Sequence, residues 1–286
     1  MIKKLTLRTV SWTCPSIENR KTITSPDQKT LALLCDENEV RRLMEENADQ
    51  PGRSRYILPI WQNLESMVYA GRLLADGSFF NPSIYCLEDL ADILDIDLDL
   101  LSDPMIQAVI KTIPHYADKS LVLELESPFS VLSAIMNPMN LYLCFEEEGD
   151  LLKDVLHRIA DASAAYVKAC AEAGCRVFSL ADPVGTMNLV GEEYYRDFCG
   201  QSEVYLMKQC QPWLEGSIMH ICLKMSQSLL IAGLAEAEPC QLSKKMTDHM
   251  DILKKMAEDE RIHFTGMTCM HNSNPDLTKS YTIKLK

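Results

Sequence analysis

The positions of apolar and polar residues predict strands and helices that alternate along the chain. Short apolar runs between turn residues are typical of buried strands, and they occur at 56–61, 121–126, 175–181, 218–222, 235–240 and 262–268. Longer segments with apolar residues on one face are typical of helices, and they occur at 30–47, 86–101, 104–113, 150–174, 192–211, 225–232 and 242–257. Further strands are expected at 4–12 and in the C-terminal SYTIKLK, and a hairpin is expected across 71–86.

Strands that alternate with helices build βα units on a parallel sheet. With the segment at 4–12 the expected strands number about eight, which predicts an α/β protein with a (βα)8 TIM barrel. We therefore expect a single domain over residues 1–286, with an N-terminal elaboration within 1–115. Such barrels carry their chemistry at the C-terminal ends of the strands.

Composition narrows the classes of partner. The formal net charge of −13 argues against a nucleic-acid partner, because phosphate backbones need clustered Lys and Arg. No apolar stretch approaches the roughly 20 residues of a membrane span, and the N-terminus lacks the long apolar segment of a signal peptide, so we expect a cytoplasmic protein without a membrane partner. The eleven cysteines are scattered, which favours reduced, buried thiols, a few of which bind metal.

A histidine and a cysteine separated by one residue stand in the segment MHICLK. His220 and Cys222 point to the same face of the expected strand, since successive side chains alternate, and they form a pair of potential metal ligands. About 0.2 such pairs are expected by chance in this composition. With Cys269, at another strand end, they would leave one position of a zinc tetrahedron open, as in catalytic sites. The alternative is that the cysteines are small buried hydrophobic residues and His220 is a core histidine.

Acidic residues at other strand ends are further candidates. Asp182, in an Asp-Pro turn after the strand at 175–181, either orients a ligand or only marks the start of a helix. Glu124 and Glu126 share one face of a strand, where they serve either as an acid–base pair or as lining of the barrel mouth.

Several segments together resemble the uroporphyrinogen decarboxylase superfamily, and within it the methylcobamide:coenzyme M methyltransferase branch. They span roughly 56–269 and are LPIWQNLESMVYAG, LVLELESPFSVLSAIM, AYVKACAEAGCRVFSLADPVGTMNLVGEEYYRDF and IMHIC. The resemblance implies zinc ligands at His220, Cys222 and Cys269, and Glu65 matches a glutamate of that branch. The chain departs from the pattern: Leu223 stands where glycine usually follows the His-x-Cys motif, and Cys269 occupies the seventh-strand position. Either Cys240 or Glu238 is a candidate for a fourth ligand.

The resemblance implies a zinc-dependent transfer of a methyl group between a methylcobamide and a thiol similar to coenzyme M, or a related acceptor such as tetrahydrofolate. The chain contains no cobalamin motif of the Asp-x-His-x-x-Gly kind, so the corrinoid is expected on a separate carrier protein. Two alternatives remain. One is a decarboxylase of tetrapyrroles, although residues 62–69, between PIW and AGR, lack the arginine of that signature. The other is a non-catalytic barrel subunit of a methyltransferase assembly.

Overall fold

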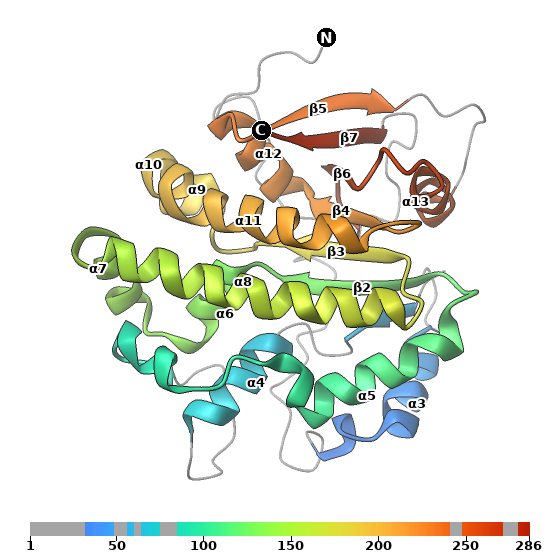
Figure 1. The fold of residues 1–286 in the computed structure, drawn as a ribbon, viewed down its shortest axis with the longest axis horizontal. Helices are drawn as coiled ribbons and strands as arrows, with labels where there is room; N and C mark the ends of the chain where they lie inside the picture. The colour runs from blue at the N-terminus through green and yellow to red at the C-terminus, as the bar shows by residue number, and fades with distance from the viewer. Residues whose placement is uncertain (1–31, 49–55, 60–63, 75–84, 241–247, 271–279) are drawn as a thin grey trace.

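A mainly parallel, seven-stranded sheet organises the molecule (Figure 1). The computed structural model describes residues 32–48, 56–59, 64–74, 85–240, 248–270 and 280–286. The strands are β1 (Tyr56–Leu58), β2 (Leu121–Glu126), β3 (Val177–Ala181), β4 (Ile218–Cys222), β5 (Ala235–Cys240), β6 (Phe264–Thr268) and β7 (Ser280–Leu285). Their order across the sheet is β1-β2-β3-β4-β6-β7-β5.

The α/β class and the parallel sheet are confirmed, whereas the described residues do not close into an eight-stranded barrel. Strands β1, β2, β3, β4 and β6 are parallel, and β4 pairs directly with β6. Strand β7 is antiparallel to both β6 and β5, which places β5 at the outer edge of the sheet. The strand expected at 4–12 lies outside the described residues.

Helices connect most of the strands. They are α3 (Glu37–Ala48), α4 (Leu64–Leu73), α5 (Pro104–Thr112), α6 (Pro128–Ile135), α7 (Pro138–Glu147), α8 (Gly149–Glu172), α9 (Met187–Val190), α10 (Glu192–Tyr194), α11 (Gly200–Cys210), α12 (Leu223–Ala232) and α13 (His249–Ala257). Short 3-10 turns occur at Leu90–Asp95, Leu100–Ser102, Ile113–Tyr116 and Gln211–Trp213, and a π turn, η4, at Tyr195–Cys199.

Two expectations differ from these bounds. The hairpin across 71–86 is wrong at its start, because Gly71 belongs to α4, whose residues Leu64–Ala70 are buried; residues 75–84 lie outside the described part. The helix expected at 86–101 is replaced by two 3-10 turns capped by Asp89 and Asp99. Both side chains accept a backbone N–H two residues ahead, which favours a tight turn over a regular helix.

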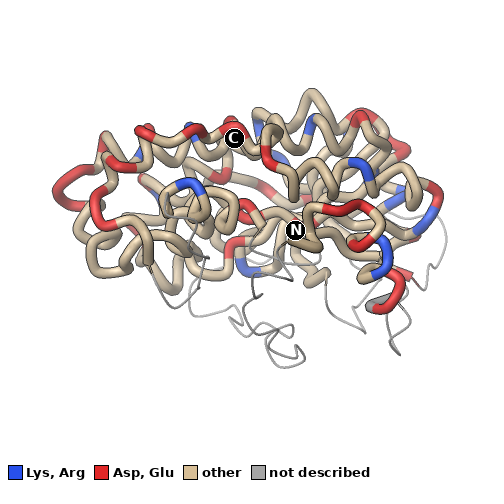
Figure 2. The backbone as a smooth tube through the Cα atoms, turned by 90° about the horizontal axis from the view of Figure 1, so that it is seen from below, with Lys and Arg blue, Asp and Glu red and all other residues tan. Residues whose placement is uncertain are grey.

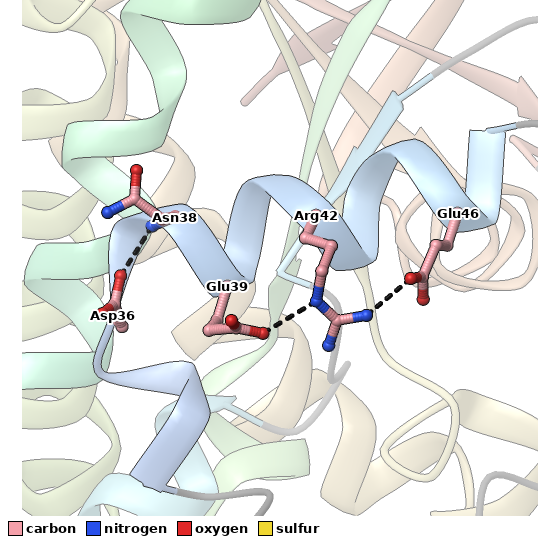
Figure 3. A network of polar contacts seen from close by, with 5 residues as sticks. All are labelled: Asp36, Asn38, Glu39, Arg42 and Glu46. Carbon is pink, nitrogen blue, oxygen red and sulfur yellow. Dashed lines mark hydrogen bonds and ion pairs between the residues drawn. The ribbon is translucent and has the colours of Figure 1, made fainter.

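Capping residues followed by proline begin three helices. Asp103 begins α5, Ser127 begins α6 and Asn137 begins α7, and each side chain accepts a backbone N–H of the first turn. Helix α8 ends before Gly174, whose φ of 107° lies in the region that favours glycine. On α3, Arg42 lies between Glu39 and Glu46 on the exposed face, while Asp36 accepts the N–H of Asn38 (Figure 3).

The two faces of the sheet are covered differently. On one face Leu123, Phe178 and Ile221 belong to a large core shared with α8 and α11. These helices lie in front of the sheet in Figure 1, roughly along the direction of β2 and β3. On the other face, Val177 and Ile218 pack in a smaller core with residues of α13. No described helix is long and apolar enough to cross a membrane.

Candidate functional site

A row of buried polar residues crosses the sheet on the α13 face. Glu124 is in register with Ser179, Ser179 with His220, and His220 with Thr265, on strands β2, β3, β4 and β6. Paired residues of neighbouring strands point to the same face, so we call these four residues the polar row. All four are at most 9% exposed. Interior positions of parallel sheets are usually branched apolar residues, so this row indicates a site.

His220 lies at the centre of the polar row and contacts two hydroxyl groups. Its Nδ1 is 3.5 Å from Ser179 Oγ, and its Nε2 is 3.1 Å from Thr268 Oγ1. Thr268 Oγ1 is also 3.5 Å from Nε2 of His249, the first residue of α13. The centroids of the His220 and His249 rings are 5.7 Å apart. Because a threonine hydroxyl has one hydrogen, it donates to at most one of the two rings and accepts from the other.

A bulge in β6 brings Thr268 to this side of the sheet. Two steps along β4, from His220 to Cys222, correspond to three steps along β6, from Thr265 to Thr268. Met267 takes the extra position with φ of 67°, a left-handed conformation that is unusual for a residue other than glycine. Without the extra residue, strand alternation would turn the Thr268 side chain to the opposite face.

The three residues predicted as zinc ligands lie at the ends of adjacent strands. Cys222 ends β4 and is half-buried, it is in register with Thr268, and Cys269 follows directly and is 5% exposed. The candidates for a fourth ligand are on β5, which β6 and β7 separate from β4 in the sheet. Glu238 of β5 forms an ion pair with Lys284 of β7, and Cys240 ends the same strand.

The three predicted ligands suit zinc in the type of their donor atoms and in their position on neighbouring strands. One imidazole and two thiols are ligands that zinc prefers, and three protein ligands leave a position for substrate. Within the described ranges, however, no three or more His, Cys, Asp and Glu side chains are already grouped as a metal site. His220 Nε2 is bonded to Thr268 Oγ1, so metal binding through that nitrogen requires the hydroxyl to move.

Asp182, the predicted catalytic residue, is 1% exposed and contacts the start of α6 and the turn after β3. Its carboxylate accepts hydrogen bonds from Ser127 Oγ, from Ser130 Oγ at 2.8 Å and from the backbone N–H groups of Val184 and Gly185. Ser127 and Ser130 belong to the start of α6. The contacts join the turn after β2 to the turn after β3, and this arrangement supports a positioning role.

Three buried glutamates lie near the ends of β2 and β3: Glu126 ends β2, Glu65 of α4 interacts with Glu126, and Glu203 of α11 interacts with Asp182. Burial, followed by the charge of Glu126, raises the pKa of Glu65 well above its usual value. Burial also raises the pKa of Glu126 to about 7, although Ser66 donates to its carboxylate. Burial and the charge of Asp182 raise the pKa of Glu203, which accepts a hydrogen bond from Tyr195. These glutamates are therefore protonated more readily than exposed ones.

Sequence reasoning missed two residues beside His220. His249 was assigned only to the helix expected at 242–257, and nothing in its spacing relates it to a residue 29 positions earlier. Thr268 was placed in a strand without a role, and its orientation depends on the bulge at Met267. Its position directly before Cys269 was the one available signal.

Comparison with known proteins places the chain among uroporphyrinogen decarboxylase-like proteins. The family model described as uroporphyrinogen decarboxylase (URO-D) matches residues 74–270. The methylcobamide:CoM methyltransferase MtbA of Methanosarcina mazei is 26% identical over 166 residues, which are 57% of this chain and 49% of that protein. The methylcobamide:CoM methyltransferase MtaA of Methanosarcina barkeri is 27% identical over 143 residues, 47% of this chain and 40% of that protein.

A solved structure supports the fold. The structure of a methyltransferase from Methanosarcina mazei superposes with a TM-score of 0.52 and 22% sequence identity, covering 66% of this chain and 57% of the other. The matches span about half the length of the curated relatives or less. The resemblance expected from the sequence is thus confirmed for the family and for the mainly parallel α/β fold.

Proposed function

The chain belongs to the uroporphyrinogen decarboxylase family, and from that premise we propose that it transfers a methyl group between a methylcobamide and a thiol. The observation that supports the proposal is that His220 and Cys222 lie on β4 and that Cys269 directly follows Thr268, the residue of β6 in register with Cys222. The named activities of the distant relatives support the same chemistry.

The transfer balances without another reactant. The thiol sulfur loses its proton to solvent and forms a bond to the methyl carbon, while the cobalt–carbon bond breaks and leaves its electron pair on cobalt. The products are a methyl thioether, a cob(I)amide and a proton. In the proposal the methylcobamide is bound to a separate corrinoid carrier protein, and the reaction takes place in the cytoplasm.

In the proposal His220, Cys222 and Cys269 hold a zinc ion, which supplies a lowered pKa for the substrate thiol when it is bound. Ser179 contacts Nδ1 of His220, and such contacts fix the orientation of a ligating imidazole. Of the two proposed thiol ligands, Cys222 is half-buried and Cys269 is buried, so Cys222 is the more exposed to solvent. Asp182 holds the turns after β2 and β3 and acts as a positioning residue.

In the proposal the chain has the domain organisation that its resemblance to the family implies. Residues 1–286 form a single domain, and a closed barrel, with the N-terminal segment 4–12 as a further strand, stays a prediction. The parallel strands β1, β2, β3, β4 and β6 are the part of such a barrel that the described residues contain.

Metal content tests the proposal. Protein reconstituted with zinc under reducing conditions and then desalted should contain about one zinc ion per chain by elemental analysis. His220→Ala, Cys222→Ser and Cys269→Ser should each lose most of it. Cys86→Ser is the matched control, because Cys86 is also half-buried but lies before η1 (Leu90–Asp95), beside the backbone of Ile135.

The outcomes separate the alternatives. Zinc lost in all three ligand variants but kept in Cys86→Ser supports the proposed site. Zinc kept in Cys269→Ser alone removes Cys269 from the ligand set and leaves His220 and Cys222. Absence of stoichiometric zinc from the wild-type protein contradicts the zinc-dependent reaction and favours a non-catalytic barrel subunit.

A further inference from the structure

A pair of buried carboxyl groups joins α11 to the turn after β3. Glu203 of α11 is 0% exposed and lies against Asp182, which is 1% exposed. We propose that Glu203 carries a proton in the folded protein and donates a hydrogen bond from Oε1 to the carboxylate of Asp182. This bond makes Glu203 a positioning residue at one end of the sheet, and it does not depend on the proposed methyl transfer.

The two carboxyl oxygens of Glu203 have different surroundings. Oε2 accepts a hydrogen bond from the hydroxyl of Tyr195 at 2.5 Å. Oε1 is buried, and no donor among the described residues reaches it. Leaving a charged acceptor buried without a donor is costly. A protonated Glu203 avoids that cost, because its Oε1 then becomes a donor to the neighbouring carboxylate.

The hydrogen bonds around the pair assign the proton to Glu203 rather than to Asp182. Asp182 accepts four hydrogen bonds, two from serine hydroxyls and two from backbone N–H groups of the turn that follows it. Bonds of this kind stabilise the ionised form of a carboxyl group. Glu203 accepts one hydrogen bond, from Tyr195. The negative charge therefore stays on Asp182.

Among the described residues no cation is paired with either carboxyl group. The titratable groups near Glu203 are Asp182 and, from η4, Tyr195 and Cys199. Helix α6, which packs against α11, has no charged residue, and the charged residues of η4, α8, α11 and α12 other than Glu203 are exposed or half-buried. Burial and the charge of Asp182 accordingly raise the pKa of Glu203 well above its usual value.

The charge of the whole chain acts in the same direction. Forty-one acidic residues against 28 basic ones give a formal net charge of −13, and acidic positions predominate along the backbone in Figure 2. A negative surrounding potential disfavours a second negative charge beside Asp182. It therefore favours one shared proton over two ionised carboxylates.

The proposed bond completes a link between three segments. Ser127 and Ser130 belong to the start of α6, Asp182 to the turn after β3, and Glu203 to α11. Because β2, β3 and β4 are parallel, this link lies at the end of the sheet where Cys222 ends β4. Loss of the proton places two negative charges side by side and weakens the link.

Infrared spectroscopy tests the protonation directly, because the carbonyl stretch of a protonated carboxyl group is separate from the bands of carboxylates. At about pH 7, where an ordinary glutamate is ionised, the wild type should show such a band that Glu203→Gln lacks. Asp182→Asn should lose it too, since the new amide can donate to an ionised Glu203. Glu45→Gln is the matched control, because Glu45 also accepts from a tyrosine hydroxyl, that of Tyr116, but is exposed. Difference spectra remove the bands of other protonated groups.

The pH dependence of stability is a second readout. The unfolded chain releases the proton near the ordinary pKa of 4.5, whereas the folded protein keeps it to higher pH. The midpoint of urea unfolding should therefore fall as pH rises from 4.5 towards the raised pKa of Glu203. In Glu203→Gln the midpoint should fall less over this range. Glu203→Leu, which bonds to neither Tyr195 nor Asp182, should have a lower midpoint than Glu203→Gln.

The outcomes decide the proposal without any assay of activity. A protonated band lost in Glu203→Gln and Asp182→Asn but kept in Glu45→Gln supports it. No band that depends on Glu203, or an equal fall of the midpoint with pH in the wild type and Glu203→Gln, overturns it. A band lost in Glu203→Gln but unchanged in Asp182→Asn overturns Asp182 as the acceptor. None of these measurements needs zinc or a cobamide, so failure of methyl transfer leaves their result unaffected.

Discussion

Replacing Asp182 tests whether this residue only stabilises the fold or also takes part in the reaction. Oδ1 accepts hydrogen bonds from Ser130 Oγ and from the N–H groups of Val184 and Gly185, and Oδ2 accepts one from Ser127 Oγ. Asp182→Ala removes both acceptor oxygens, and with them all four hydrogen bonds, from a position that is 1% exposed. Asp182→Asn keeps an oxygen in the place of Oδ1, and its amide can donate to Ser127 and Glu203.

The magnitude follows from the donors left without a partner. Each buried donor that loses its acceptor costs about 1–3 kcal/mol, and the two backbone N–H groups cannot turn elsewhere. Asp182→Ala should therefore lower the free energy of unfolding by about 4 kcal/mol. Asp182→Asn loses only the charge assistance of its bonds and should cost about 1–2 kcal/mol. Since small domains are stable by about 5–15 kcal/mol, the asparagine variant should still fold.

Urea unfolding followed by circular dichroism measures both variants, and methyl transfer is then measured per folded molecule of Asp182→Asn. We expect a rate close to that of the wild type. Removal of a group that moves a proton in the transition state costs about 100-fold or more. A loss of that size with little change in stability would refute the positioning role and restore Asp182 as a catalytic residue. Equal stability of Asp182→Ala and wild type would refute the hydrogen-bond reasoning.

Three further predictions follow from buried groups. The pKa of Glu126, about 7 in the folded protein against an ordinary 4.5, means that the folded state keeps a proton which the unfolded chain releases. The free energy of unfolding should therefore fall as pH rises from 4.5 to about 7, and urea titrations of Glu126→Gln should show a smaller fall; an equal fall would contradict the assignment. Gly266→Ala should cost about 1–3 kcal/mol, because a Cβ would meet Ser226 and approach Ile283 to 3.1 Å, whereas Gly71→Ala, with open space in α4, should stabilise by about 0.5–1 kcal/mol. Thermal unfolding compares the two, and equal effects would argue against close packing at Gly266. Thr268→Val should change the ¹⁵N shift of His220 Nε2 in zinc-free protein; an unchanged shift would show that the hydroxyl is not its partner.

Much of the fold followed from local patterns. The long helix α8 was predicted from its apolar face and the glycine after it, and β2, β4 and β6 from short apolar runs. Local patterns do not determine how strands are ordered, and β7 between β6 and β5 was therefore not foreseen. Helices α6 and α7 were missed, although Ser127-Pro128 and Asn137-Pro138 are capping signals.

The site was predictable only in part, for a similar reason. His220 and Cys222 share a strand, so alternation alone placed them on one face. Their neighbours come from register across the sheet: Ser179 and Glu124 from β3 and β2, and His249 from a helix whose approach no local pattern determines. Asp182 was identified as an acid at a strand end, but the two serine hydroxyls that bond to it lie more than 50 residues away, at the start of α6.

The central claim is the proposed transfer of a methyl group from a cobamide to a thiol at a zinc site that includes Cys222, the last residue of β4. Anaerobic single-turnover loss of methylcobalamin absorbance, with cysteamine in excess and zinc-reconstituted protein above the cobamide concentration, tests it most directly. The account predicts a cob(I)alamin spectrum and stoichiometric S-methylcysteamine with the wild type, and neither above background with Cys222→Ser. Equal rates for the two proteins, or no demethylation by the wild type with cysteamine, 2-mercaptoethanol or 2-mercaptoethanesulfonate, would contradict it.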